Sequence, residues 1–174
     1  MGYAPSVARH LGFDPIEEAH RQWSKRWPEA ADAMAANTSI MRAQQIVLGA
    51  VDQALRPFGL TFARYEALVL LSFARKGELP LGKMGPRLML HPTSVTNIVD
   101  RLEQDRLVIR VPHPSDRRTT LARITPAGRA LAQVATEAVN EVRFGVGALK
   151  PDELRQLVDL VRRLRLAAGD FDVT

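Results

Sequence analysis

The chain has 174 residues, of which 46% are hydrophobic and 25% are charged, and its net charge is +5. This balance is typical of one globular protomer, and no apolar run reaches the roughly 18 residues of a membrane span, so we expect no membrane partner. The sequence contains no cysteine, which excludes a disulfide framework, a thiolate nucleophile and a cysteine-ligated metal; with no signal peptide apparent, we expect a cytoplasmic protein.

Two helices are predicted at the N-terminal end. Asp14, Pro15 and Glu17 are typical of a helix start, and this helix is expected to end or kink at Pro28. A second helix is predicted from about residue 29 to residue 56. Such a helix of ~27 residues is ~40 Å long. Because a small lobe cannot cover that length, we expect another surface to bury part of it.

The middle of the chain predicts a helix-turn-helix. Thr61 precedes a helix over about residues 62–75, and a short supporting helix is predicted over residues 81–88. Pro92 suits the first position of a third helix. The first of these helices is predicted to face inward with its aromatic and valine residues, namely Phe62, Tyr65, Val69 and Phe73. In the third, the spacing of a half-buried helix is kept by Val95, Ile98, Val99 and Leu102.

A two-stranded β-hairpin is predicted next. Residues 107–111 and 119–125 are rich in β-branched side chains, and Pro112, Pro114 and Ser115 between them favour a turn. The tip carries an Asp-Arg-Arg sequence. Residues 76–78, before the supporting helix, are expected to form only a turn. A basic hairpin that follows a helix-turn-helix fits a wing reaching along a phosphate backbone.

Two amphipathic helices are predicted at the C-terminal end. The first follows Thr125 and Pro126, and the second begins at Pro151. Their apolar faces are expected to consist of Ala127, Leu131, Val134, Ala138 and Val142 in the first helix, and Leu154, Leu157, Val158, Val161 and Leu164 in the second. With the long N-terminal helix, they expose more apolar surface than one protomer can bury. A symmetric homodimer is therefore predicted.

The positive charge is concentrated in the same middle segment. Between Thr61 and Arg129, 12 Lys and Arg residues stand against 6 Asp and Glu residues. A basic patch on one module is typical of nucleic-acid binding. Surface charge that serves solubility alone is the alternative.

The sequence of this segment resembles the MarR family of winged-helix transcriptional regulators. The resemblance covers Thr61 to Leu131 and is carried by the strings HPTSVTNIVDRLEQDRLVIR and HPSDRRTTLARITPAGRAL. The expected fold is thus mainly α with a small β-hairpin wing (α+β), a winged helix-turn-helix that is dimeric through its N- and C-terminal helices. We expect dimerisation and ligand-pocket helices in residues 1–60, the DNA-binding domain in residues 61–125 and dimerisation helices in residues 126–174.

The predicted DNA-binding residues lie on the third helix and the wing. Hydroxyl and amide side chains can contact base edges or phosphates in the major groove. The set consists of Pro92, Thr93, Ser94, Thr96, Asn97, Arg101, Asp116, Arg117 and Arg118. For Arg101 an ion pair with Asp105 is the alternative.

The resemblance implies particular roles for the wing. Arg118 would enter a narrow minor groove, which favours a guanidinium. Asp116 would orient it, besides forming the turn, and Arg117 would hold the backbone. In a dimer, the two DNA-binding domains are related by a twofold axis. They therefore need a DNA site that is an inverted repeat, with half-sites ~10 bp apart.

A small-molecule effector is also implied. Residues that could line its pocket are His20, Trp23, Trp27, Arg42, Arg64 and Tyr65. An N-terminal helix with a tryptophan resembles the urate-responsive branch of the family, but Ile98 stands where that branch has an arginine. We therefore expect a different ligand, anionic or aromatic. Alternatively, both tryptophans pack in the dimer core.

Two other classes of function are weighed against a ligand-responsive repressor. An enzyme is disfavoured, because the histidines His10, His20, His91 and His113 show no metal-ligand spacing and no nucleophile or phosphate-loop motif is present. No cofactor, metal or catalytic residue is expected. The second alternative is a ligand-independent or architectural DNA-binding dimer, which would bind an inverted repeat and random DNA with similar affinity.

Overall fold

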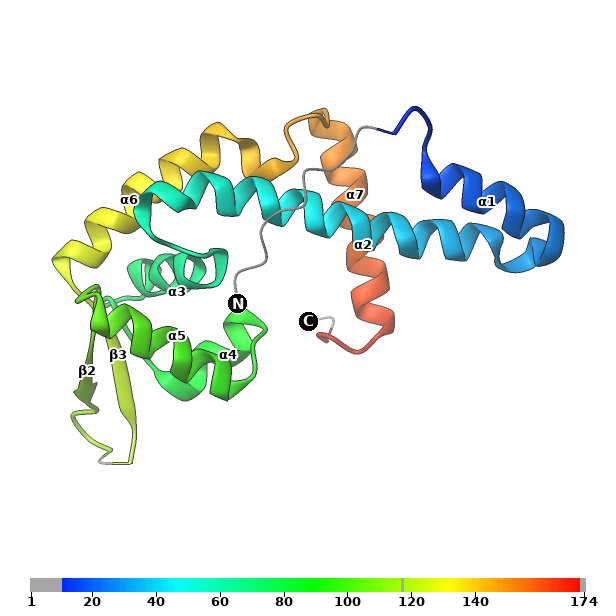
Figure 1. Ribbon diagram of the computed structural model, residues 1–174. Coiled ribbons are helices and arrows are strands. Elements are labelled where there is room, and N and C mark those ends of the chain that lie inside the picture. Colours follow the sequence, from blue (N-terminus) through cyan, green and yellow to red (C-terminus); the bar gives the residue numbers. More distant parts are fainter. Residues whose placement is uncertain (1–10, 117, 173–174) are drawn as a thin grey trace.

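The computed structural model describes residues 11–116 and 118–172. Helices make up most of these residues, and three short strands form one small sheet (Figure 1). The helices are α1 (Pro15–Arg26), α2 (Pro28–Leu55), α3 (Phe62–Phe73), α4 (Leu81–Leu88), α5 (Pro92–Gln104), α6 (Pro126–Glu141) and α7 (Pro151–Ala167). The strands are β1 (Glu78–Pro80), β2 (Val108–Pro112) and β3 (Thr120–Ile124), and short 3₁₀ turns cover Arg56–Phe58 and Arg143–Gly145.

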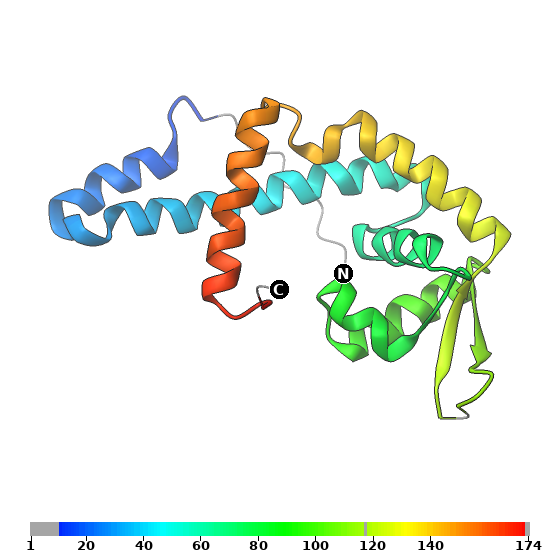
Figure 2. The ribbon, with the colours of Figure 1, turned by 180° about the vertical axis from the view of Figure 1, so that it is seen from behind.

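The molecule has a globular lobe at one end and an extended pair of helices at the other. The lobe contains α3, α4, α5 and the sheet, and α2 runs from it across the length of the molecule (Figures 1 and 2). α6 lies beside the C-terminal half of α2, while α1 folds back along its N-terminal half. α7 runs transverse to α2 in both views. The mainly α architecture and its winged helix-turn-helix are as expected.

The N-terminal hairpin forms for the reasons that its sequence indicates. The Asp14 carboxylate accepts a hydrogen bond from the Ile16 N–H at 2.8 Å, as an N-cap does. α1 ends at Arg26, and Pro28 takes the first position of α2, where its missing N–H costs no hydrogen bond. The predicted break at Pro28 is confirmed.

The sheet has one strand more than predicted. β1 pairs with β3 in antiparallel register, with Leu79 opposite Ala122, so the order is β1-β3-β2. The expectation that residues 76–78 form only a turn is therefore wrong at Glu78. A strand of three residues is too short to show an alternating pattern. Its place is fixed by pairing with β3, which is distant in sequence.

One apolar core joins the lobe to the adjoining halves of α2 and α6. The side chains that are almost fully buried in it include Val51, Leu55, Leu68, Leu71, Met84, Val95, Val99, Leu102, Val108 and Val139. Pro86 lies within α4, which has the predicted bounds. Helix α5, the expected recognition helix of the helix-turn-helix, buries Val95, Val99 and Leu102 as predicted, and Ile98 is half-buried beside them.

The inward face of α3 differs from the prediction. Tyr65, Leu68 and Leu71 are buried, whereas Phe73 is 83% exposed. Both sets of residues keep a helical spacing, and α3 is apolar on more than one side. The packing of α5 and α6 against it selects the face with the leucines, so Phe73 is left outside the core.

The inward face of α6 also differs. Its buried residues are small, namely Gly128, Ala132, Ala135 and Val139, while the predicted Val134 and Val142 are exposed. A Cβ on Gly128 would lie 2.1 Å from the carbonyl oxygen of Leu107. This close approach to the chain before β2 requires glycine and fixes which stripe faces the lobe.

The terminal helices expose large apolar side chains of the kind that are buried in the lobe. None of the residues of α1 or α7 is fully buried. Exposed large apolar side chains gather on α2 and on the C-terminal segments, as Ile40, Met41, Ile46, Val134, Val142, Phe144, Leu157, Val158, Leu160 and Leu164. Within the described residues, no helix combines the length and the apolarity that crossing a bilayer requires.

Candidate nucleic-acid interface

The recognition helix α5 presents a polar face on the surface of the lobe. His91 caps it, since its Nδ1 accepts a hydrogen bond from the Thr93 N–H at 3.3 Å. Opposite the buried valines lie the predicted contact residues: Pro92, Thr93, Thr96, Asn97 and Arg101 are exposed, and Ser94 is half-buried. The Thr96 hydroxyl donates to the Pro92 carbonyl at 3.2 Å. The predicted set is therefore brought together on one face of one helix.

Arg101 is not engaged with Asp105. Its Nη1 donates to Gln104 Oε1 at 3.2 Å, while Asp105 pairs with Arg64 Nη1, also at 3.2 Å. The alternative in which Arg101 is held by Asp105 is thus contradicted. Arg64, one of the candidate effector residues, lies beside the recognition helix. A hollow of about 510 Å³ between α3 and α5 is lined by Thr61, Arg64, Asn97, Ile98 and Arg101.

The wing is closed by a tight turn around Asp116. One carboxylate oxygen of Asp116 accepts from the Thr119 hydroxyl at 2.6 Å, and the other accepts from the Arg118 N–H at 3.0 Å. These two hydrogen bonds, first the Thr119 one, lower the pKa of Asp116 below its ordinary value. Asp116 thus holds the main chain of Arg118, whose side chain is exposed. Arg117 lies outside the described residues.

A second hollow separates the wing from α4. It measures about 620 Å³, and Lys83, His113 and Arg118 lie in its wall. The sequence pattern does not reveal that Lys83 lies near the wing, because the start of α4 is brought there by the pairing of β1 with β3. Cationic side chains therefore line both hollows, with Arg64 and Arg101 in the one beside α5. Such a surface suits a polyanion.

The candidate effector residues do not form one site within a protomer. Trp23 and Trp27 lie together with ring centroids 4.8 Å apart, and His20 Nε2 lies 2.7 Å from Asp32 on the same hairpin. This hairpin and the lobe are at opposite ends of the molecule (Figure 1). Arg42 donates to Gln45 on α2 at 3.0 Å. Tyr65, only 4% exposed, is a core residue whose hydroxyl donates to Thr136 at 3.1 Å.

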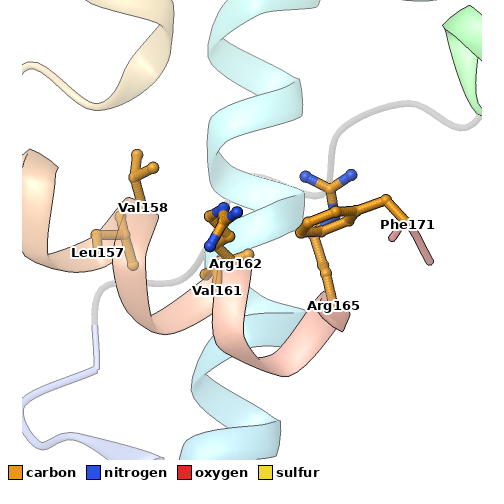
Figure 3. A pocket seen from close by; sticks show the side chains of 6 residues that line it. All are labelled: Leu157, Val158, Val161, Arg162, Arg165 and Phe171. Atoms are coloured by element: carbon orange, nitrogen blue, oxygen red, sulfur yellow. The ribbon is translucent and has the colours of Figure 1, made fainter. Parts of the chain in front are cut away.

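An unpredicted hollow lies along α7. It measures about 510 Å³ and is lined by Leu157, Val158, Val161, Arg162, Arg165 and Phe171 (Figure 3). Phe171 folds back so that the guanidinium groups of Arg162 and Arg165 lie 5.2 and 5.3 Å from its ring centroid. Since the hollow depends on this reversal after α7, helix periodicity alone does not reveal it. Among the described residues, no three His, Cys, Asp or Glu side chains are grouped to hold a metal.

Comparison with known proteins agrees with this geometry. The profile of the MarR family matches residues 60–120. The HTH-type transcriptional regulator MhqR of Bacillus subtilis is 30% identical over 133 residues, which cover 76% of this chain and 90% of that protein.

Solved structures extend the similarity. Sco5413, a MarR family transcriptional regulator from Streptomyces coelicolor, is 55% identical with a TM-score of 0.74, and the match covers 82% of this chain and 99% of that one. CouR from Rhodococcus jostii RHA1, bound to p-coumaroyl-CoA, is 31% identical with a TM-score of 0.66, covering 80% and 95% of the two chains.

Proposed function

Because this chain belongs to the MarR family of transcriptional regulators, we propose that it binds an inverted-repeat operator as a homodimer. It represses transcription there until a small anionic or aromatic ligand releases it. The observation that carries the proposal is the pairing of two exposed elements. Helix α5 and the wing belong to the same lobe (Figure 1). Both carry exposed polar side chains, which include Asn97 on α5 and Arg118 on the wing.

The two elements suit neighbouring grooves of one duplex. A helix of the width of α5 enters the major groove, where Asn97 can bond adenine and Thr93 and Ser94 can bond bases or phosphates. The wing tip then extends sideways, and Arg118 reaches the adjacent minor groove. Arg117, as part of the same tip, contacts the backbone in this proposal.

The exposed apolar surface of the terminal helices supports the proposed dimer. Leu157, Val158 and Leu164 on α7 are exposed, and so are Ile40 and Ile46 on α2. Burying them against the same residues of a second copy removes apolar area from water, at roughly 25 cal/mol per Å². If a twofold axis passes between these helices, the two lobes lie at the ends of the dimer. Each lobe then presents one copy of α5 and one wing to the DNA.

The ligand binds, in this proposal, where the hairpin of one protomer meets the lobe of the other. CouR binds p-coumaroyl-CoA, an aromatic anionic thioester. The Trp23–Trp27 pair supplies an aromatic surface of the kind that such a ligand stacks on, with Arg26 against Trp27 and Arg42 on α2. Release requires that the ligand favour a spacing of the two lobes that no longer matches the half-sites.

The sharpest test of DNA reading removes one guanidinium. Arg118→Ala should weaken operator binding by about tenfold at fixed salt, since such a contact contributes ~1–3 kcal/mol. Arg163→Ala, which removes an equally exposed arginine from the polar side of α7, serves as the control and should change little. Equal affinities of all three proteins in a fluorescence-anisotropy titration would contradict the proposal.

The architectural alternative is distinguished by specificity. A regulator should prefer its inverted repeat over random duplex by about 10³-fold or more. A preference near unity would favour a dimer that binds DNA by charge alone. Selection of bound sequences from a random pool supplies both the operator and this ratio.

A further inference from the structure

A cluster of three charged side chains joins the base of the wing to the recognition helix. Arg110 of β2 donates from Nη2 to Asp100 Oδ1 at 2.5 Å and from Nη1 to Glu103 Oε2. Its main-chain N–H donates to the other oxygen of Glu103 at 3.0 Å. Because a guanidinium is a planar fork, donation to two carboxylates restrains its direction as well as its distance.

Arg110 stands where the apolar core ends along β2. Val108, two residues earlier and on the same face of the strand, is fully buried against the core residues of α5. Arg110 itself is half-buried. Burial lowers the pKa of Arg110, but hydrogen bonds with Asp100 and Glu103 outweigh this and raise it overall. The guanidinium therefore stays charged.

The outer part of the wing is restrained by its own turn. The His113 N–H donates to the Thr119 carbonyl at 3.1 Å, and Asp116 bonds Thr119 and Arg118. Among the hydrogen bonds of the described residues, none joins the wing to α5 beyond Arg110. Arg110 is thus the outermost wing residue with a hydrogen bond to α5 among the described residues.

We infer that Arg110 is a positioning residue for operator reading, which holds the wing at the angle that brings Arg118 to the minor groove while α5 occupies the major groove. The inference rests on the proposed function of α5 and the wing. Asp100 and Glu103 hold the guanidinium of Arg110 in place. They lie one turn apart on α5, next to the face that carries Asn97 and Arg101.

A double-mutant cycle tests this inference. Arg118→Ala is compared in the natural sequence and in Arg110→Gln, with operator affinity measured by anisotropy at one salt concentration. If Arg110 places the wing, Arg118→Ala costs about tenfold in the first background and less than about twofold in the second. The same loss in both backgrounds would overturn the inference. No loss in either would instead contradict the proposed DNA reading itself.

Charge is separated from position by a neutral variant. Loss of Arg110 also leaves two carboxylates beside the DNA phosphates, which repel them. The triple variant Asp100→Asn, Glu103→Gln, Arg110→Gln removes that repulsion. Positioning predicts that Arg118→Ala still costs little in this background. Recovery of the full tenfold cost would show that repulsion alone explains Arg110, and would overturn the inference.

Arg123 offers a matched control in the same sheet. Its Nε lies 2.6 Å from Glu78 Oε2, so it ties β3 to β1 rather than to α5. Arg123→Gln should leave the cost of Arg118→Ala near tenfold; loss of that cost here too would indicate general loosening of the sheet and contradict the specific role. Arg110→Lys, which keeps the charge but not the fork, should give an intermediate cost and serves if Arg110→Gln does not fold.

Discussion

In the winged lobe the large apolar side chains of α3, α4, α5 and the sheet meet in one core, whereas α1 and α7 contain no fully buried residue. The two regions are similar in kind, since both are built from amphipathic helices. They differ in where the apolar faces find a partner. The lobe buries its apolar faces within one chain, while those of the terminal helices stay exposed in the single protomer. Stability should therefore depend on the lobe, and assembly on the terminal helices.

The largest expected effect is a loss of thermal stability from a substitution in the lobe. Gly128→Ala places a Cβ 2.1 Å from the Leu107 carbonyl oxygen, which belongs to the main chain and cannot simply rotate away. Overpacking of this kind costs about 3 kcal/mol, and thermal unfolding should shift down by roughly 10 °C.

Gly49→Ala is the matched control in α2. A Cβ there meets no atom within 4 Å, and alanine favours a helix interior over glycine by roughly 0.5–1 kcal/mol. Its melting temperature should stay constant or rise. If Gly128→Ala melted at the same temperature as the natural protein, the close approach of Gly128 to the Leu107 carbonyl would be disproved.

The next largest effect is a loss of dimerisation from a substitution that leaves the fold of the lobe intact. Leu164→Glu adds a charge to the exposed apolar face of α7. We expect monomers by sedimentation with unchanged helix content, and operator affinity lower by about 100-fold or more because two linked reading heads bind with avidity. Arg163→Glu places the same side chain on the polar side and should remain dimeric, even though it changes the net charge by two units rather than one. If Leu164→Glu also sedimented as a dimer, α7 would not be the interface.

A smaller effect is expected at the N-terminal hairpin. Its two tryptophans are the only ones in the sequence, so tryptophan emission, excited selectively, reports on this hairpin alone. Trp23 and Trp27 are 37% and 48% exposed in one protomer, and coverage by a second copy should shift their emission to shorter wavelength. Dilution below the dimer dissociation constant should reverse the shift. Emission independent of protein concentration and of oligomeric state would place the hairpin outside the interface.

The smallest expected effect is a pH dependence in the lobe. Burial raises the pKa of Glu66 on α3, so its charged form costs stability in the folded state. This cost is absent below the ordinary glutamate pKa of about 4.3 and appears as the pH rises through the higher folded value. Glu66→Gln should therefore stabilise the protein at pH 7, by less than about 0.5 kcal/mol given its partial exposure, but not at pH 4. Glu141→Gln, an exposed carboxylate on α6, is the comparison, and a gain independent of pH would contradict the assignment.

Local sequence signals predicted those parts of the fold that depend on neighbours in the chain. The caps at Asp14 and Thr125 and the period of α5 each require only a few adjacent residues, and the structure confirms all three. Thr93, Asn97 and Arg101 were assigned to one face of α5 for the same reason, and they share it.

Parts that depend on distant contacts were predicted less well. β1 exists only because β3 pairs with it, and the buried stripe of α6 is chosen by the approach of Gly128 to Leu107. The role of Arg110 was missed too, although Asp100 and Glu103 at i, i+3 on α5 signal a possible cationic partner. Finding that partner requires knowing that β2 returns alongside the helix.

The central claim is that the exposed faces of the terminal helices join two protomers, so that two lobes bind one DNA site. The most direct test is the number of protomers bound per duplex. Sedimentation of the protein with a selected inverted repeat should give two protomers per duplex, bound tightly when the half-sites are ~10 bp apart and weakly when ~5 bp are inserted, since the second head then faces away. One protomer per duplex, with an affinity indifferent to the insertion, would contradict the account.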